Sequence, residues 1–382
     1  MRLPRLRFLE ERAALRAFES QDASFRQLVF YSEGPGDWPH IGPVVEELLE
    51  HHDQPISYLS SDADDPGLAL VHPNLRAFSI GAGTVRTIGF ARIDCRRFVM
   101  TLPDLGQLWL KRSVHRVEYV YMFHSINSTH TSYRKGAFDQ FDTILSVGPH
   151  HLGEIRASEA RYGLPTKRII EHGSTKLDTV LAAVERASVE PKPSEDLRPR
   201  LLIAPSWGEC SLIERPVGVM LIDALLGAGL PTVLRLHPMT VRRCPDLVSR
   251  LRSRFDAHPR FRLEADMSAM DSWLHSDLMI SDWSGAATEF AFSLLKPVLY
   301  IDTPAKRVNP DWQEIRLPAF EDVIRSQVGR VVGEDDVASV PDVVADLVAT
   351  DRSAERARNR EGAIFNVGLS TAVAASYLAD AG

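Results

Sequence analysis

A stretch rich in small residues in the second half of the chain has the composition of an anion-binding turn. Residues 281–290 read SDWSGAATEF and follow the apolar run Leu278–Ile280, so a strand is predicted to give way to a helix there. Small side chains leave room for a phosphate at the first helical turn, where unpaired N–H groups and the positive end of the helix dipole favour an anion. The residues of this stretch that are predicted to bind a phosphate-bearing donor substrate are Ser281, Asp282, Ser284, Gly285, Ala286 and Glu289.

This turn has two interpretations. A helix end contributes about 0.3–1 kcal/mol to anion binding when exposed, so tight binding of a diphosphate also needs cationic groups. In the functional interpretation Glu289 accepts hydrogen bonds from ribose hydroxyls. The alternative is an ordinary helix start capped by Asp282 or Ser284.

Two further polar segments follow predicted strands in the same half of the chain. In Arg235–Pro238 the proline ends the strand and stiffens the turn. His237 is therefore expected to project toward a ligand and donate to a phosphate oxygen, with Arg235 on the same face. In the segment APSWG, Ser206 and Trp207 are expected to face the same ligand. The alternatives are a structural histidine and a tryptophan that fills a hinge.

The first half of the chain carries a dense polar run, YMFHSINSTHTSYRK, at residues 121–135. A run so rich in donors is costly to bury unless it meets a ligand or a hydrogen-bond network. His124, at the end of a predicted strand, is positioned to take a proton from an acceptor hydroxyl. A solvent-exposed loop is the alternative. The residues expected to contact acceptor or phosphate are Ser125, Ser128, His130, Arg134 and Lys135.

These segments need a scaffold, and apolar runs alternating with helical patterns predict βα units with mostly parallel sheets. Strands are predicted in the first half at Gln27–Tyr31, Ile56–Ser60, Leu75–Ile80, Arg97–Thr101, Val117–Phe123, Thr143–Val147 and Arg168–Glu171. In the second half they are predicted at Leu201–Ala204, Thr232–Leu236, Phe261–Leu263, Leu278–Ile280 and Val298–Ile301. Every polar segment above follows such a strand, where ligands of open parallel sheets bind.

The predicted fold class is therefore α/β, with two Rossmann-like doubly wound domains facing across a cleft. The proline- and charge-rich segment RASVEPKPSEDLRPR reads as a linker. The expected organisation is an N-terminal acceptor-side domain at 1–188, a linker at 189–199, a C-terminal nucleotide-binding domain at 200–350 and terminal helices at 351–382.

Composition narrows the function classes. The formal net charge of −7 argues against a nucleic-acid binder, and no apolar run is long enough to span a bilayer. A cytoplasmic protein with three reduced cysteines is expected. The basic N-terminus forms either a peripheral membrane contact or a solvated helix packed by its leucines. No cofactor is expected. No metal site is expected either, since the adjacent histidines His150 and His151 should point apart at a helix start.

Taken in order, these segments resemble the CDP-glycerol glycerophosphotransferases of teichoic-acid and capsule synthesis, which have the GT-B fold. Ala204–Trp207 is similar to the family's APTW segment, Arg235–Pro238 matches its RLHP, and Asp277–Ser284 resembles its D-x-L-I-(T/S)-D-Y-S-S run. Phe123-His124-Ser125 stands in place of the family's tryptophan-His-Gly motif. The stretch containing Gly173 and Asp178 is similar to the family's G-x-P-R-x-D.

The resemblance implies a transferase that moves glycerol phosphate, or a related alditol phosphate, from a CDP-linked donor to a hydroxyl of a glycan or polyol-phosphate acceptor. His124 and His237 would be its catalytic residues. The alternatives are a nucleotide-sugar glycosyltransferase or UDP-sugar 2-epimerase on the same fold, and a non-catalytic nucleotide-binding component of a polymer-export complex.

Overall fold

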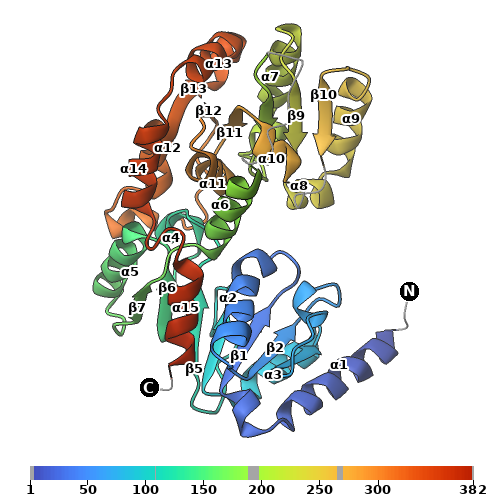
Figure 1. Ribbon diagram of the computed structural model, residues 1–382, viewed down its shortest axis with the longest axis vertical. Coiled ribbons are helices and arrows are strands. Elements are labelled where there is room, and N and C mark those ends of the chain that lie inside the picture. Colours follow the sequence, from blue (N-terminus) through green and yellow to red (C-terminus); the bar gives the residue numbers. More distant parts are fainter. Residues whose placement is uncertain (1–3, 108, 188–197, 265–269, 381–382) are drawn as a thin grey trace. The chain divides into compact units, whose positions relative to one another are not determined.

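The computed structural model describes residues 4–107, 109–187, 198–264 and 270–380, which form two compact units (Figure 1). Unit 1 consists of Met1–Thr179, Val308–Leu317 and Ala363–Gly382, and unit 2 of Val180–Arg307 and Pro318–Gly362. The chain therefore returns twice to unit 1 after entering unit 2. All but the last two residues of the expected linker, 189–199, lie outside the described residues.

The sheet of unit 1 has seven strands in the order β3-β2-β1-β4-β5-β6-β7, and every neighbouring pair is parallel. This order reverses direction between β1 and β4, as in doubly wound folds. The strand β1 is buried along its whole length, which explains its nearly continuous apolar sequence, LVFYS. The strands are β1 (Leu28–Ser32), β2 (Ile56–Ser60), β3 (Leu75–Ser79), β4 (Arg97–Met100), β5 (Glu118–Met122), β6 (Thr143–Ser146) and β7 (Arg168–Glu171).

Helices connect these strands and cover the sheet. Helix α2 shows how: its Ile41, Val44, Val45 and Leu48 recur at helical spacing and enter the core beside β1 and β2. The described helices that begin in unit 1 are α1 (Pro4–Glu19), α2 (Trp38–His51), α3 (Thr84–Arg92), α4 (Thr129–Ser132), α5 (Pro149–Tyr162), α6 (Thr175–Ala187) and α15 (Ser370–Ala379), with short 3₁₀ turns at Ala23–Arg26, Pro66–Leu68 and Trp312–Ile315.

Unit 2 has a six-stranded parallel sheet in the order β10-β9-β8-β11-β12-β13, with its own switch point between β8 and β11. Its core joins Leu201, Ile203 and Ile280 of the sheet to Leu221 and Leu225 of helix α7. The strands are β8 (Leu201–Ile203), β9 (Thr232–Arg235), β10 (Phe261–Glu264), β11 (Leu278–Ser281), β12 (Val298–Asp302) and β13 (Gly329–Gly333).

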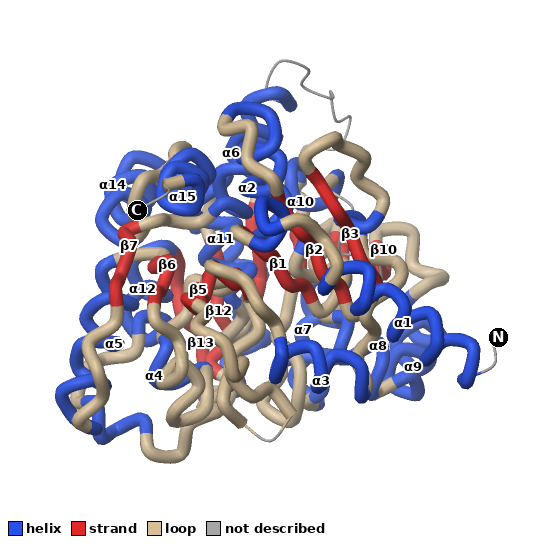
Figure 2. The backbone as a smooth tube through the Cα atoms, turned by 90° about the horizontal axis from the view of Figure 1, so that it is seen from below, coloured by secondary structure: helices blue, strands red, loops and turns tan. Residues whose placement is uncertain are grey.

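Figure 2 shows the layers of unit 1, where α2 and α15 lie on one face of the strands and α3 lies on the other. Unit 2 also has helices between and after its strands. They are α7 (Pro216–Gly227), α8 (Pro238–Arg243), α9 (Pro245–Phe255), α10 (Asp271–His275), α11 (Gly285–Leu294), α12 (Phe320–Val328), α13 (Val340–Ala349) and α14 (Ser353–Ala363), with 3₁₀ turns at Leu212–Glu214 and Glu334–Ser339.

All twelve predicted strands are present, with ends that differ by at most one residue. Strand β13 was not predicted; it pairs with β12 and forms the edge of the sheet. Its five residues include Gly329 and Gly333, and the strand is half-exposed, so it lacks the continuous apolar signal of the buried strands.

The last segment of the chain completes unit 1. Helix α15 packs against α2, and the carboxylate of Asp178 accepts hydrogen bonds from the N–H groups of Gly368 (2.8 Å) and Ser370 (2.7 Å). Gly173 has φ +104°, and a Cβ there would come within 2.3 Å of the Phe365 carbonyl oxygen. The two residues that resemble the family's G-x-P-R-x-D therefore hold the C-terminal segment in place.

Helix α1 is packed by only part of its length. Leu15 and Phe18 are buried, whereas Leu6, Phe8 and Leu9 are exposed. The packed half agrees with the solvated-helix interpretation and the exposed half keeps the membrane-contact interpretation open. Among the described residues, no helix is both long and apolar enough to cross a membrane. Membrane contact stays a prediction.

Arg97 anchors the other end of α15, and this contact gives the first testable prediction. The buried guanidinium donates to the carbonyls of Tyr377 (3.0 Å), Leu378 (3.1 Å) and Asp380 (2.8 Å). Its Nε also pairs with Glu118 at 2.9 Å. Because Arg97→Met leaves these acceptors without a donor, we expect it to lower the free energy of unfolding by about 3 kcal/mol in urea titrations. Arg92→Met, at an exposed position nearby, is the control, and equal stabilities of the two variants would contradict the assignment.

Candidate functional site

The candidate site of unit 2 lies at the switch point of its sheet. The loops after β8 and β11 meet there, joined by the fully buried carboxylate of Asp282. It accepts hydrogen bonds from Ser206 N (2.8 Å), Ser206 Oγ (3.0 Å) and Leu212 N (2.8 Å). Ser281 Oγ donates to Ala204 O at 2.6 Å. Asp282, Ser281 and Ser206 therefore fasten the two loops together from within.

Burial raises the pKa of Asp282, and the donors at Leu212 and Ser206 oppose that rise. Donors that are aimed at a buried carboxylate stabilise its charged form. The network therefore depends on all three hydrogen bonds.

Helix α11 begins where the sequence predicted an anion-binding turn. Ser284 is its N-cap and accepts a hydrogen bond of 3.4 Å from Ala286 N. The helix start is half-buried, while Glu289 is buried one turn further on. Trp283 fixes the approach to this turn, since its Nε1 donates to Thr303 O at 2.8 Å and Arg325 lies 3.8 Å from its ring centroid. An N-cap and a phosphate contact are compatible, because the N-cap satisfies only one of the unpaired N–H groups.

His237 lies at the end of β9 in a defined tautomer. Its Nδ1 accepts a hydrogen bond from Met239 N at 3.1 Å and caps helix α8. The proton of the neutral ring is therefore on Nε2, which can donate to a ligand oxygen. Burial, and next the charge of Lys306, lower the pKa of His237 to about 4. At neutral pH this histidine is an uncharged hydrogen-bond donor.

The positive charge beside His237 comes from residues that the sequence analysis did not single out. Lys306 Nζ donates to Trp207 O at 3.0 Å and lies 3.8 Å from the centroid of the Trp207 ring. The guanidinium carbon of Arg243 is 4.9 Å from that centroid, and the His237 ring is 6.0 Å from it. The only available signal was position: Lys306 follows β12 and Arg243 ends α8.

Glu214 ties the remaining loops of this edge to one another. Its Oε1 accepts from Gly208 N at 3.0 Å and from Thr240 Oγ1 at 2.7 Å. Arg235, expected near the phosphate, is instead buried against Glu264 (3.1 Å) and Ser272 (2.6 Å). The guanidinium of Arg235 thus contributes to the sheet rather than to an exposed cationic surface.

In unit 1, His124 lies half-buried at the end of β5, as predicted. Its Nδ1 is 3.4 Å from the hydroxyl of Tyr121, which is fully buried among aromatic rings. The His40 ring lies 6.0 Å from the His124 ring and the Tyr133 ring 6.1 Å from it, both nearly perpendicular. His124 is thus held by strand and ring packing rather than by a flexible loop.

The polar run after His124 is folded back on helix α5. Glu154 accepts from Thr129 Oγ1 at 2.8 Å and its Oε1 lies 3.4 Å from His130 Nδ1. Burial raises the pKa of Glu154, but its partners, His130 first, outweigh this and lower it to about 2. Ser125 Oγ accepts from Asn127 N at 3.2 Å, and buried Ser128 precedes α4. These residues meet a dense network, the condition under which so polar a run can be buried.

His150 and His151 complete that network and correct an expectation. Their rings do not point apart, since the centroids are 4.3 Å apart. Each Nε2 bonds a neighbouring carbonyl, His150 that of Ile126 (2.7 Å) and His151 that of Asn127 (2.9 Å). Because the two carbonyls belong to neighbouring residues, Ile126 and Asn127, both histidine side chains turn to the same side. Among the described residues no group of three or more His, Cys, Asp or Glu is placed to hold a metal.

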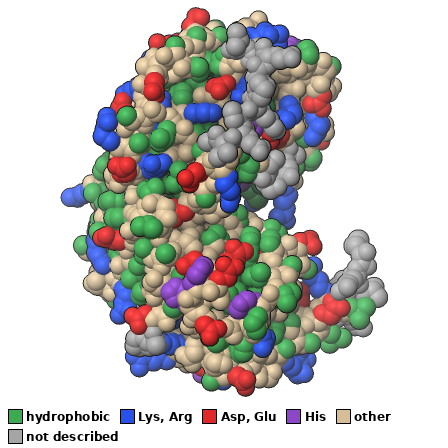
Figure 3. All heavy atoms as spheres, viewed as in Figure 1, with side chains coloured by type: hydrophobic (Ala, Val, Ile, Leu, Met, Phe, Trp, Pro, Cys, Tyr) green, Lys and Arg blue, Asp and Glu red, His purple; other side chains and the backbone are tan. Residues whose placement is uncertain are grey.

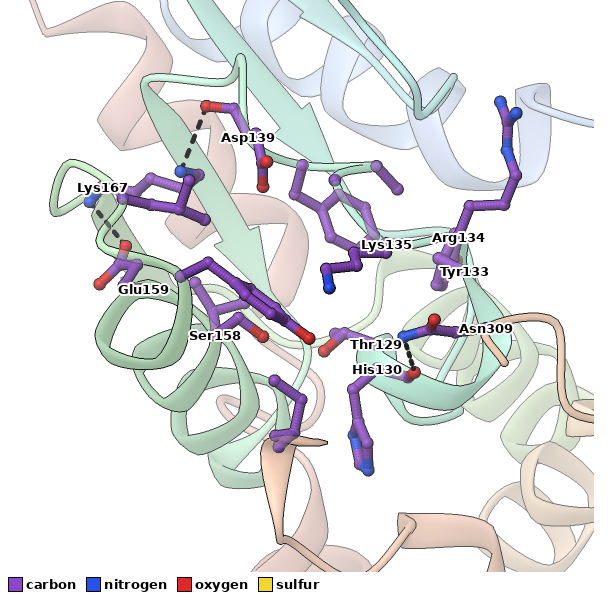
Figure 4. Close-up of a pocket in the computed structure, with 17 residues that line it drawn as sticks. Thr129, His130, Tyr133, Arg134, Lys135, Asp139, Ser158, Glu159, Lys167 and Asn309 are labelled. Carbon is purple, nitrogen blue, oxygen red and sulfur yellow. Dashed lines mark hydrogen bonds between the residues drawn. The ribbon is translucent and has the colours of Figure 1, made fainter. Parts of the chain in front are cut away.

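Three of the five predicted acceptor contacts line one narrow pocket of unit 1 (Figure 4). His130, Arg134 and Lys135 contribute to it, but His124, Ser125 and Ser128 do not. Asn309, from the first returning segment, closes the pocket by donating to His130 O at 3.0 Å. Arg134 pairs with Asp104 at 2.7 Å, and Lys135 lies 3.5 Å from both Asp311 and Glu314. His124 is not part of the pocket lining, whereas Tyr133, whose ring lies 6.1 Å from the His124 ring, is.

On the face shown in Figure 3, basic and acidic side chains are interspersed. That face therefore has no large surface of one charge sign.

No family model and no curated protein matches this chain. Solved structures do match. The wall teichoic acid polymerase TagF, solved with CDPG, is 12% identical, with a TM-score of 0.58 over 98% of this chain and 93% of that one. UDP-GlcNAc 2-epimerase from Neisseria meningitidis, bound to UDP-GlcNAc, is 14% identical, with a TM-score of 0.59 over 92% and 99%.

A third match is the complex of MnaA from S. aureus with UDP, which is 12% identical, with a TM-score of 0.60 over 91% of this chain and 94% of that one. At these identities the likeness shows the fold: two Rossmann-like units of the GT-B type. It does not separate transferase from epimerase chemistry.

The environment of His237 gives a prediction for NMR titration. Its imidazole signals are expected to stay constant from pH 8 to pH 5.5, with a midpoint near the pKa of about 4. Because the folded pKa lies below the unfolded value, the contribution of this residue to stability falls as pH drops from about 6.5 toward 4. His237→Asn assigns the signal, and a midpoint above pH 6 would contradict the buried, neutral state.

Proposed function

We propose that this protein is a transferase that moves glycerol phosphate, or a related alditol phosphate, from a CDP-linked donor to a hydroxyl of a cell-surface polymer or glycan, with release of CMP. The proposal rests chiefly on the edge of unit 2, where a neutral imidazole donor, two cations and a helix start surround the switch point. The order of the family-like segments supports the choice of donor.

The unit 2 groups suit a diphosphate. Two neutral donors, His237 Nε2–H and the N–H of Gly285, lie at the same edge of unit 2 as the cations Lys306 and Arg243, while the N–H of Ala286 is used by the Ser284 cap. A helix end alone binds such a group weakly, so the cations supply the larger share of the attraction. Trp207 offers an aromatic face beside them. As phosphoryl transfer proceeds, these groups stabilise the charge that builds on the leaving CMP.

His124 is the proposed general base. With its Nδ1–H donating to the Tyr121 hydroxyl, Nε2 carries the lone pair that takes the proton of the acceptor hydroxyl. The acceptor oxygen then forms a bond to the β-phosphorus of the donor. The bond from that phosphorus to the bridging oxygen breaks, and CMP leaves with the electron pair. The acceptor contacts proposed earlier, Ser125 to Lys135, remain predictions.

A nucleotide-sugar glycosyltransferase or 2-epimerase is the second candidate, because two of the three structures described above are solved with UDP or UDP-GlcNAc and share the fold equally well. A non-catalytic nucleotide-binding component is the third. Donor choice and turnover separate the three.

A nucleotide-release screen tests the donor. With CDP-glycerol or CDP-ribitol and a polyol-phosphate acceptor we expect CMP release, and no UMP or UDP release with UDP-sugars. Lys306→Met removes a cation near the leaving group and is expected to lower kcat/KM about 10²-fold. Arg242→Met, which removes an exposed charge next to Arg243, is the control. A response to UDP-sugars alone favours the second candidate, and nucleotide binding without release favours the third.

Replacement of His124 tests the base. His124→Asn keeps a polar side chain of similar size but has no basic nitrogen, so kcat should fall about 10²–10⁴-fold while CMP affinity stays unchanged. His115→Asn, at an exposed position, controls for the loss of an imidazole. Near-native turnover in folded His124→Asn would remove this residue from the chemical step.

A further inference from the structure

Three strand-end segments of unit 1 converge on His40. This residue lies in the first turn of α2, which follows β1. Its ring is 6.0 Å from that of His124, after β5. Its carbonyl accepts a hydrogen bond of 2.7 Å from Thr175 Oγ1, at the start of α6 after β7. The convergence lies at the carboxyl edge of the sheet, where parallel sheets bind ligands.

The residues on either side of Thr175 add two more basic groups. Lys176 follows it directly, and His172 precedes it by three residues. His172 is fully buried, and among the described residues neither of its ring nitrogens has a hydrogen-bond partner. A buried imidazole without partners is costly, and such a group in a strand-end cluster indicates that a ligand or bound water completes it. We call His40, His124, His172 and Lys176 the imidazole cluster.

The groups that lower the pKa of His40 are all basic. Burial, and then Lys176, His124 and His172, lower the pKa of His40 well below its usual value. Burial also lowers the pKa of His172 to about 3. The groups that act on His40 are thus all bases. Two tyrosines, Tyr121 and Tyr133, lie beside His124, and the charge of Asp37 acts on Tyr121.

We propose that the imidazole cluster is a binding site for a phosphate group of the substrate. It rests on the proposed function and deepens it, since it assigns phosphate recognition to unit 1 in addition to the diphosphate site of unit 2. The phosphate belongs either to a polyol-phosphate acceptor or to the alditol phosphate being transferred. In both cases Lys176 supplies a permanent charge and the imidazoles of His40 and His172 supply N–H donors at the oxyanion, while the N–H of His124 stays on the Tyr121 hydroxyl.

Phosphate binding at this cluster is expected to be coupled to the uptake of protons. An anion next to neutral imidazoles raises their pKa from the low values of the free protein, about 3 for His172, so binding takes up protons and affinity increases as the pH falls through the raised pKa of the complex. A merely structural role for these residues produces no such uptake. Calorimetry in two buffers of different ionisation enthalpy measures it directly.

The test is titration of the full-length protein with glycerol 3-phosphate, CMP and CDP-glycerol. Lys176→Gln and His40→Asn are expected to weaken glycerol 3-phosphate binding about tenfold or more, with CMP affinity unchanged within about twofold. His51→Asn, at an exposed position on the same helix, is the control. Lys306→Met should show the reverse pattern, with weaker CMP binding and unchanged glycerol 3-phosphate binding.

The outcomes separate the sources of the phosphate. If Lys176→Gln also weakens CDP-glycerol binding, the cluster holds the group being transferred; if CDP-glycerol affinity is unchanged, it holds a phosphate of the acceptor. Unchanged glycerol 3-phosphate affinity in folded Lys176→Gln, no binding to the wild-type protein at millimolar concentrations, or loss of binding in Lys306→Met overturns the proposal. If His40→Asn does not fold, Lys176→Gln decides alone. Absence of CMP binding contradicts the proposed function instead.

Discussion

The buried carboxylate of Asp282 is the contact on which the unit 2 site depends. It accepts two hydrogen bonds from Ser206 and one from Leu212, so the loop after β11 cannot move without the loop after β8. A buried charge is costly unless every lone pair is satisfied, and therefore the geometry is strongly constrained. Because Trp207 follows Ser206 and helix α11 begins shortly after Asp282, this junction fixes the positions of both. Glu214 extends the same principle to the loop after β9.

Burial gives several imidazoles of this protein the same uncharged state. His237, His40 and His172 all have lowered pKa values because their surroundings disfavour a charged ring. A neutral ring still donates one hydrogen bond, and it gains a proton most readily when an anion arrives. Lys306 and Lys176 carry permanent charge nearby. At each proposed site a permanently charged lysine attracts the anion, and neutral imidazoles donate hydrogen bonds to it and gain protons when it binds.

The architecture of unit 1 depends on residues that follow unit 2 in the chain. Residues 363–380 pack against α2 through Ala374, Ala375 and Leu378, and Arg97 and Asp178 hold the two ends of α15. The segment at 308–317 contributes Asn309 to the pocket that contains Lys135. The chain thus crosses between the units four times, whereas a single linker was expected. Such contacts join residues up to 283 positions apart, as in the bond from Arg97 to Asp380, and no local pattern carries that information.

The amino-acid order alone determined the strands, because buried parallel strands need continuous apolar runs such as Leu28–Tyr31 and Leu278–Ile280. It also placed the polar segments at strand ends, since proline and glycine mark where pairing stops. The edge strand β13 was not predicted because a half-exposed edge strand does not need a continuous apolar run. Side-chain roles were decided only in the tertiary structure. Arg235 turned inward because Glu264 and Ser272 lie beside it, and Lys306 joined the site because β12 ends next to the Trp207 loop. A side chain binds the partner that folding brings within about 3 Å, and the separation along the chain does not reveal that partner.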